Sequence, residues 1–530
     1  MSGGTRARFR CWLVGEGALP VACGEELLAR GHRITGFAGA DGPARQWAAE
    51  HGIPCADRVR DLRGARPDHL LSIVNPAILD AAELRTPREM AINFHSSPLP
   101  RYAGVHQTAW AVLNGEQHYG VTWHVMAEGV DSGDILVQEH FPLEDDETTL
   151  SLGIKAYDHG LTSFTELLDG LERGRLRPRA QDLGERTYFS RRDRMPGAGL
   201  IGPAHRAEEV ERWCRAASVG DLDNVFGSPK LLVGDEAVVV HEVSLRPASP
   251  APPGTRVPGP PQVAVLATPG ADLVLHRLRR LDGTELSGAR WAEATGLAVG
   301  DRLALPDDAL RRRAQQLDSE YGIRERYWTG ALTDVNPPPA ALPGLTPASG
   351  QATTAQHVHR IRVPAHRGVD TASARWDLLA DLAAAWLSYA AGFGAPRQTV
   401  WWSAPALRDQ VGDLTSLFAT AVPVTPQVPD TPAPGADHAR QALATALQTA
   451  EKKGTFPHDL PLRRPRLGLG SPGAGLAFAL ETDGPVRLRP TPWATVCLDR
   501  SGPWLNLVGA DADTCFALAS VLLPALSTAA

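Results

Sequence analysis

The sequence has few cysteines, few lysines and no long hydrophobic run. Only six of its 530 residues are cysteine and none form a CxxC pair, so we expect neither a disulfide scaffold nor a zinc or other metal site. The first 17 residues hold no apolar run long enough for a signal peptide. The last apolar stretch, residues 517–526, is too short to cross a bilayer and contains Pro524. These absences predict a cytoplasmic protein without a membrane span.

The charge balance is mildly acidic, with 53 Lys and Arg against 60 Asp and Glu and a net charge of −7 when His is neutral. A chain of this charge is a poor binder of phosphate backbones, so we do not expect nucleic acid as a partner. The hydrophobic fraction of 43% and the charged fraction of 21% are typical of globular protein. At this length the chain has room for about three domains.

The first 190 residues alternate between strand-like and helix-like segments. Apolar runs predict strands at residues 11–14, 33–38, 70–74 and 90–94, and helical periodicity predicts helices at 19–30 and 76–82. This alternation favours an α/β domain with a doubly wound, mostly parallel sheet, whose ligands bind beyond the carboxyl ends of the strands. The turn Gly15-Glu16-Gly17 resembles the start of a dinucleotide fingerprint. Because position 20 is Pro, an ordinary tight turn is the favoured interpretation.

The rest of the chain divides into two further predicted domains. Short strands at 230–233, 237–243, 262–267 and 273–279 predict a small β-barrel-like domain over 205–305. Residues 320–530 suggest a mixed α/β lobe, with helices at 376–389 and 437–450 and a strand at 399–403. Proline-rich stretches at 246–262, 336–350 and 423–435 are expected to be loops or linkers.

Three polar residues near strand ends form the candidate catalytic site. Asn93 and His95 alternate at the end of one predicted strand, so both side chains leave on one face. Asp131 lies in a turn that follows the strand-like run 121–125. An amide can donate to a developing oxyanion, and a carboxylate can orient an imidazole and help to carry protons. The three residues suit acyl transfer. Capping of the loops by Asn93 and Asp131, and a histidine whose hydrogen bonds are all made within the fold, would also explain them.

The sequence around these three residues resembles that of the formyltransferases that use 10-formyltetrahydrofolate. That family carries an Asn-x-His pair, a Ser-Leu-Leu-Pro loop, a later Gly, and an Asp in an Asp-x-Gly turn. Here the loop is residues 97–100, with Pro98 where Leu is usual, followed by Gly104 and by Asp131 and Gly133. The resemblance covers roughly residues 9–190. It implies that Asn93 binds the formyl oxygen, that His95 donates or relays a proton, and that Asp131 orients His95 and accepts the proton of the amine.

The same resemblance implies residues for the donor and the acceptor. The pterin of the 10-formyltetrahydrofolate co-substrate would lie along apolar and main-chain positions, namely Pro76, Ile78, Leu79, Ser97, Ala127, Gly129 and Val130. Packing at the sheet edge would explain these positions as well. The acceptor candidates are His106, Gln107, Trp110 and His124, for which a packing role is the alternative.

The flanking segments resemble formyltransferase domains at the start of nonribosomal peptide synthetases. This resemblance rests on residues 14–32, 103–126 and 185–195. Residues 205–305 are similar in placement to the small barrel that follows many formyltransferase domains. Residues 320–530 resemble the second half of a condensation domain without its His-His-x-x-x-Asp motif, since His357 and His359 are separated by Val358 and no Asp follows. This lobe is therefore expected to hold a carrier protein or acceptor, or only to complete the fold.

These features favour an N-formyltransferase of specialised metabolism. Its acceptor would be an amine on a small metabolite or on a carrier-bound aminoacyl group. Two alternatives stay open: transfer of a related one-carbon group such as formimidoyl, and a docking protein with an inactive transferase domain. Formylation of initiator tRNA is less favoured, because the chain is acidic and has an additional lobe.

Overall fold

The computed structural model describes residues 7–335, 357–367, 369–429, 435–467, 476–480, 494–499, 502–509 and 512–527. These residues form two compact units. The first unit comprises the described residues up to Asp193 together with Glu211–Gly220. The second unit comprises Arg194–Val210 and the described residues from Asp221 onward. Both predicted C-terminal domains thus lie in one unit, and the division into three domains stays a prediction. No helix among the described residues is long and apolar enough to span a membrane.

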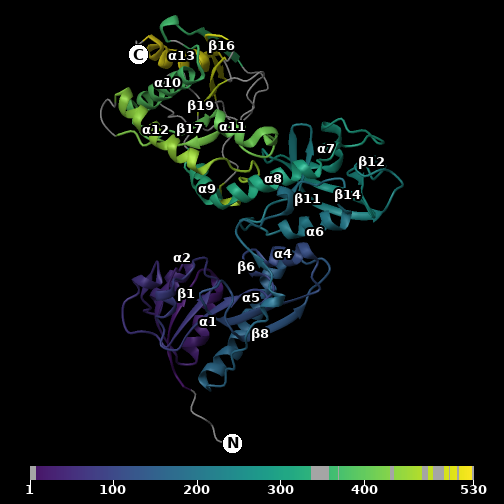
Figure 1. Ribbon diagram of the computed structural model, residues 1–530, viewed down its shortest axis with the longest axis vertical. Coiled ribbons are helices and arrows are strands. Elements are labelled where there is room, and N and C mark those ends of the chain that lie inside the picture. The colour runs from purple at the N-terminus through teal and green to yellow at the C-terminus, as the bar shows by residue number, and fades with distance from the viewer. Residues whose placement is uncertain are drawn as a thin grey trace, which may run out of the picture. The chain divides into compact units, whose positions relative to one another are not determined.

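The first unit is built on a seven-stranded sheet in the order β3-β2-β1-β4-β5-β7-β8 (Figure 1). Pairing is parallel from β3 to β5, whereas β5–β7 and β7–β8 are antiparallel. The predicted mostly parallel α/β sheet is therefore confirmed. Strands β1 to β5, β7 and β8 are, in that order, Arg10–Val14, Arg33–Ala38, Cys55–Ala56, His69–Ile73, Met90–His95, His118–Val125 and Ile135–Pro142.

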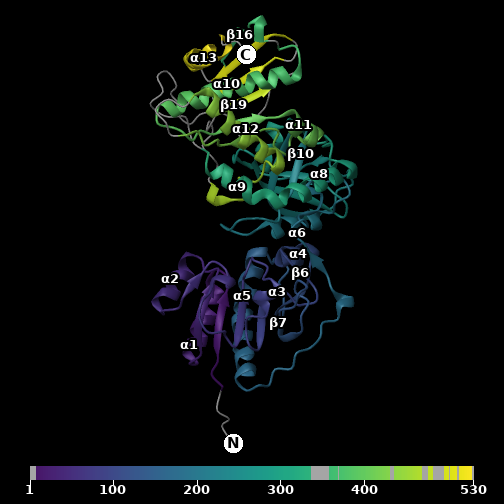
Figure 2. The same cartoon turned by 60° about the vertical axis from the view of Figure 1, so that its left-hand side comes forward.

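Helices α1 (Ala18–Ala29) and α5 (Thr149–Glu172) pack together beside this sheet (Figure 2). Their contact is close because Gly160 of α5 has no side chain, which leaves room for Phe94 and Leu19. The turn before α1 needs a glycine for a similar reason, since a Cβ at Gly15 would lie 1.8 Å from the Ile73 carbonyl oxygen. That close approach is what the tight-turn interpretation requires.

The predicted helix at 76–82 is wrong over most of its length. Helix α3 covers only Ala81–Leu84, and Asp80 caps it by accepting from the amides of Ala82 and Glu83. Before it, the Asn75 side chain accepts from the Ala77 amide. Such a local side-chain bond competes with helix formation. Helices α2 (Gly42–Glu50) and α4 (Gln107–Asn114) also belong to this unit, together with the part of α6 (Ala207–Ala217) from Glu211 onward.

An antiparallel six-stranded sheet opens the second unit, in the order β10-β11-β14-β13-β12 with β15 paired to β14. All four predicted strands of this region are confirmed, but β11 is longer than expected and enters the predicted linker at Arg246. Closure of the sheet into a barrel stays a prediction. The strands are Lys230–Val233, Glu236–Pro247, Arg256–Val257, Ala264–Ala267, Ala271–Arg280 and Glu285–Ser287, and α6 (Ala207–Ala217) and α7 (Gly288–Ala294) flank them in the chain.

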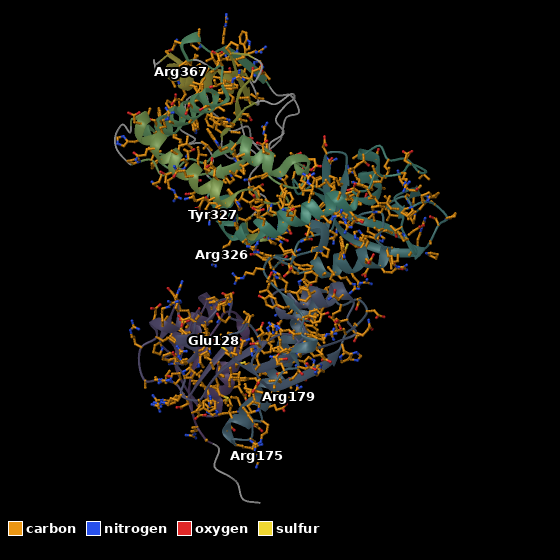
Figure 3. The ribbon with its side chains drawn as sticks, viewed as in Figure 1. Glu128, Arg175, Arg179, Arg326, Tyr327 and Arg367 are labelled. Atoms are coloured by element: carbon orange, nitrogen blue, oxygen red, sulfur yellow. The ribbon has the colours of Figure 1, made fainter. Side chains whose placement is uncertain are left out.

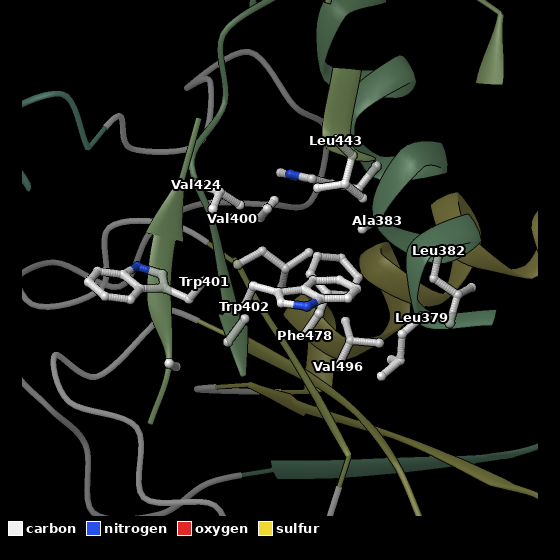
Figure 4. Packing of buried hydrophobic residues seen from close by; sticks show 14 of the residues in the cluster. Leu379, Leu382, Ala383, Val400, Trp401, Trp402, Val424, Leu443, Phe478 and Val496 are labelled. Carbon is white, nitrogen blue, oxygen red and sulfur yellow. The ribbon is translucent and has the colours of Figure 1, made fainter. Parts of the chain in front are cut away.

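A second, mixed sheet of the same unit has the order β16-β21-β20-β19-β17-β18. Helices α10 (Ala372–Gly392) and α12 (Ala436–Lys453) pack on it, and Leu379, Leu382 and Leu443 meet Trp402 and Phe478 in its core (Figure 4). In chain order the strands β16 to β21 are His357–Arg362, Val400–Ser403, Val422–Val424, Leu476–Leu480, Ala494–Leu498 and Trp504–Gly509. The other helices are α8 (Asp308–Tyr321), α9 (Glu325–Thr333), α11 (Pro405–Val411) and α13 (Ala512–Ser527).

Two proline-rich stretches were predicted incorrectly as entirely loop: residues 246–262 contain the end of β11 and strand β12, and residues 423–435 contain part of β18. Pro423 lies inside β18, which is the edge strand of the mixed sheet. A proline is tolerated there because an edge strand leaves some amides without a ladder partner. Residues 430–434 of that stretch and the predicted linker 336–350 lie outside the described residues.

A buried cluster of charges links β10 of the antiparallel sheet to residues 459–463 and to helix α9. Lys230 of β10 lies 2.7 Å from a carboxylate oxygen of Asp459, and Arg463 lies 3.1 Å from the other. Arg194 lies 2.7 Å from Glu325, which also accepts from Arg463. Because these side chains are almost completely buried, each charge depends on its partners for stabilisation.

Candidate active site

Asn93 and His95 lie at the carboxyl end of β5, on the same face, as predicted. His95 is buried, and its Nε2 lies 2.9 Å from the Tyr102 carbonyl oxygen. A carbonyl oxygen only accepts, so Nε2 carries the hydrogen and the other ring nitrogen of the neutral imidazole is unprotonated. That nitrogen, Nδ1, lies 3.6 Å from Oδ2 of Asp131.

His124 is the fourth member of this cluster. It lies directly opposite Asn93 in the β5–β7 pairing, where a register shift interrupts the next strand pair. Its Nδ1 lies 2.9 Å from the Val125 carbonyl oxygen, so its Nε2 is free to accept from the Asn93 amide nitrogen at 3.2 Å. The same Nε2 lies 3.6 Å from Oδ1 of Asp131. Because His124 is buried here, we group it with the catalytic candidates rather than with the acceptor side.

Asp131 adopts a left-handed backbone conformation with φ of 49°. The Gly104 amide donates to its Oδ2 at 2.9 Å. Burial opposes ionisation of this carboxyl, but the neighbouring imidazoles of His95 and His124 and the Gly104 amide outweigh it and hold its pKa well below the usual range. Asp131 is therefore a carboxylate at neutral pH.

The protonation of the cluster leaves it ready to accept a proton. Burial lowers the pKa of His95, and the opposing effects of Asp131 and the Tyr102 carbonyl do not restore it. His95 and His124 each place a ring nitrogen 3.6 Å from one oxygen of the Asp131 carboxylate. Two imidazoles and a carboxylate thus lie together, a set suited to take up a proton from a substrate and pass it on.

The loop between β5 and α4 is held by its own hydrogen bonds. Ser97 is fully buried, and its hydroxyl lies 3.0 Å and 3.1 Å from the carbonyl oxygens of Arg101 and Tyr102. Thr122 donates to the Ser97 carbonyl at 2.7 Å. These contacts give Ser97 a role in shaping the loop, and direct contact with a cofactor stays a prediction.

Apolar side chains are exposed where the strands end. Val74, with φ of 53°, is 48% exposed, Ile78 is 84% exposed and Val130 is 42% exposed. Ala127 and Gly129 are also exposed, and the Pro76 carbonyl accepts from Arg191 at 2.9 Å. Leu79 differs, because it is buried in the cluster that contains Trp12 and Val14. Exposed apolar side chains beside accessible main chain suit a flat heteroaromatic ring.

The remaining acceptor candidates surround the start of α4. His106 precedes the helix in a left-handed conformation with φ of 59°. Gln107 donates to the Ser96 hydroxyl at 2.7 Å. The Trp110 ring stacks on Phe189, with centroids 4.3 Å apart. Their contact with an acceptor stays a prediction. Among the described residues, no group of His, Cys, Asp and Glu side chains is arranged to hold a metal ion.

Comparisons with known proteins identify the family of this chain. A family described as "Formyl transferase" matches residues 56–166, which include all four members of the cluster. A methionyl-tRNA formyltransferase from Synechococcus sp. is 30% identical over 286 residues, which cover 50% of this chain and 85% of that protein. The chain belongs to the formyl transferase family. It is a transferase, and formyl is the group that the family moves.

Other members of the formyl transferase family are similar over shorter or more divergent stretches. A methionyl-tRNA formyltransferase from Trichlorobacter lovleyi is 28% identical and covers 49% of this chain and 82% of its own. A GDP-perosamine N-formyltransferase from Brucella melitensis biotype 1 is 31% identical and covers 28% and 56%. Among solved structures, an N-formyltransferase from Helicobacter canadensis, in complex with folinic acid and dTDP-3-aminofucose, is 18% identical with a TM-score of 0.41, covering 51% of this chain and 99% of that one.

Proposed function

We propose that the first unit transfers a formyl group from 10-formyltetrahydrofolate to an amine. The observation that carries this proposal is the convergence of Asn93, His95, His124 and Asp131 at the carboxyl ends of β5 and β7. The exposed apolar side chains of Val74, Ile78 and Val130 nearby support a site for the pterin.

Each residue has a defined role in the proposed reaction. As the amine nitrogen attacks the formyl carbon, the carbonyl becomes an oxyanion, and the Asn93 amide donates a hydrogen bond to it. The Asn93 amide is oriented by His124, which accepts its other hydrogen. Asp131 accepts the proton that the amine loses and passes it to Nδ1 of His95, which relays the same proton to the departing folate nitrogen and returns to its neutral form. The C–N bond to folate breaks as the new amide is completed.

The acceptor we propose is an amine of a specialised metabolite or of an aminoacyl group on a carrier protein. The resemblance of residues 14–32 and 103–126 to formyltransferase domains of peptide synthetases supports this class. We also propose that residues 320–530 are a condensation-like lobe that binds the carrier without forming amide bonds, since the His-His-x-x-x-Asp motif is absent from the sequence. The intact polar cluster disfavours an inactive docking protein.

Mass spectrometry of the reaction tests the donor and the transferred group together. The chain is incubated with 10-formyltetrahydrofolate and a panel of free and carrier-bound amines, and the mass added to each amine identifies formyl or formimidoyl. We expect Asn93→Ala and Asp131→Ala to slow formyl transfer by about 10²–10³-fold. Transfer at the wild-type rate by either variant contradicts the proposed roles. Transfer by the full chain to free amines but to no carrier-bound amine would contradict the carrier role.

A further inference from the structure

A segment after α5 wraps around the candidate active site. We call residues 179–191 the strap. Its start pairs with β8, where the Ile135 amide donates to the Arg179 carbonyl at 2.8 Å and the reverse bond is 2.9 Å. Figure 3 labels Arg179 on the first unit, together with Glu128 from the loop that leads to Asp131. The strap lies outside the matched family region of residues 56–166.

Two side chains of the strap hold the main chain of the Asp131 turn. The Gln181 amide nitrogen donates to the carbonyl oxygens of Asp131 at 2.9 Å and Gly133 at 2.6 Å, which uses both of its hydrogens. Arg186 donates to the Val130 carbonyl at 2.8 Å and to the Asp131 carbonyl at 3.3 Å. Three of the four carbonyls of residues 130–133 are therefore bound by the strap.

The turn needs such support because its conformation is unfavourable by itself. Asp131 lies in the left-handed region, which is unfavourable for a residue other than glycine. Gly133 permits the turn, since a Cβ there would lie 1.8 Å from the Val125 carbonyl oxygen. The turn fixes where the Asp131 carboxylate points, and the carboxylate lies 3.6 Å from both imidazoles. A small rotation of the turn would change both distances.

The far end of the strap holds the opposite loop of the site. Strand β9 (Tyr188–Phe189) pairs in parallel with β6 (Ala103–Gly104). Thr187 accepts from the Tyr102 amide at 2.7 Å. Tyr102 in turn provides the carbonyl that holds His95, and Gly104 provides the amide that binds Asp131. The start of the strap therefore holds the Asp131 turn, and its far end holds the loop that provides the hydrogen-bond partners of His95 and Asp131.

We infer that Gln181 and Arg186 are positioning residues that fix the Asp131 carboxylate against His95 and His124. They act on the main chain of the turn and touch no reacting atom. The inference rests on the proposed function for its catalytic consequence, but the positioning itself is measurable without catalysis.

Gln181→Met is the sharpest test, because methionine keeps the length of the side chain and removes both donated hydrogen bonds. We expect the turnover number to fall by at least tenfold and backbone hydrogen exchange to increase over residues 127–134. The acidic limb of the pH profile should move to lower pH, because the Asp131 carboxylate that raises the pKa of His95 is held less closely to the ring. Gln46→Met is the matched control, because Gln46 is exposed on α2 and bonds only to Glu50.

Arg186→Lys is the second variant and keeps the charge with fewer fixed donors. It should give a smaller effect in the same direction, so the inference stays testable if Gln181→Met does not fold. Wild-type turnover, exchange and pH profile in both variants would overturn the inference. If the wild-type chain transfers no formyl group but Gln181→Met still loosens residues 127–134, the proposed function has failed and the positioning stands.

Discussion

The tautomers of two histidines decide how the site handles protons. His95 donates through Nε2 to Tyr102, and His124 donates through Nδ1 to Val125. Each ring therefore turns its acceptor nitrogen toward Asp131. A proton that enters the cluster finds three acceptors within a few ångströms, which is the property a general base needs.

Replacing His124 with Phe should slow the reaction without weakening substrate binding. The change removes the acceptor for the Asn93 amide while keeping a ring of similar size. Loss of one orienting hydrogen bond, worth about 1 kcal/mol, corresponds to a fall in turnover number of roughly five- to tenfold. Steady-state kinetics measure it, and His118→Phe at the exposed start of β7 is the control. An unchanged turnover number would contradict the role given to His124.

The pH dependence of turnover follows from the two shifted groups. The pKa of Asp131 lies below its usual range and burial lowers the pKa of His95, so both hold their active states at neutral pH. With saturating acceptor, the turnover number should stay constant through neutral pH. Its acidic limb, where the turnover number falls, should lie at pH values below the ordinary pKa range of an imidazole. Asp131→Asn should move this limb to still lower pH, because the carboxylate is what raises the pKa of His95. A limb that shifts upward would contradict this arrangement.

At the scale of elements, the buried charge cluster joins helix α9 to the turn at 459–463. Glu325 binds Arg194 and Arg463, and all three are buried. Replacing one partner leaves the others buried with their charge uncompensated. The cluster therefore makes the second unit sensitive to single substitutions far from any proposed catalytic group.

Glu325→Gln should destabilise the second unit by about 3–5 kcal/mol. Denaturant unfolding of the purified chain measures the change, and Glu451→Gln on the exposed face of α12 is the control. Because Glu325 and the catalytic candidates belong to different units, formyl transfer by the folded variant should be unchanged. A loss of stability no larger than that of the control would show that the cluster contributes little.

At the scale of the whole molecule, the two predicted C-terminal domains form one compact unit. The carboxylates of Asp318, Glu325 and Asp459 lie beyond residue 305, whereas Arg194 and Lys230 lie before it. A fragment of residues 1–305 would therefore leave two buried cations without their partners. It would also remove five of the ten buried residues in the apolar cluster that contains Ala237 and Val239.

We expect the fragment 1–305 to be degraded by dilute protease at residues 221–305, while residues 7–193 of the fragment 1–220 resist digestion. The shorter fragment keeps its own contacts, such as those from Arg215 and Ala216 to Glu147 and Thr149. Limited proteolysis with mass spectrometry of the products measures the difference. Equal resistance of residues 221–305 in the fragment and in the full chain would show that the barrel-like region folds by itself.

The sequence by itself determined the parallel α/β class, the strands that carry the site, and the trio of Asn93, His95 and Asp131. Local patterns were sufficient because apolar runs define buried strands, and an Asn-x-His pair must project from one face. The sequence named His124 only as an acceptor candidate, and the tertiary structure placed it opposite Asn93 on the neighbouring strand. Only the tertiary structure added Gln181, which lies 50 residues from Asp131. Pairing across a sheet and hydrogen bonds between distant loops depend on three-dimensional register, which no local pattern records.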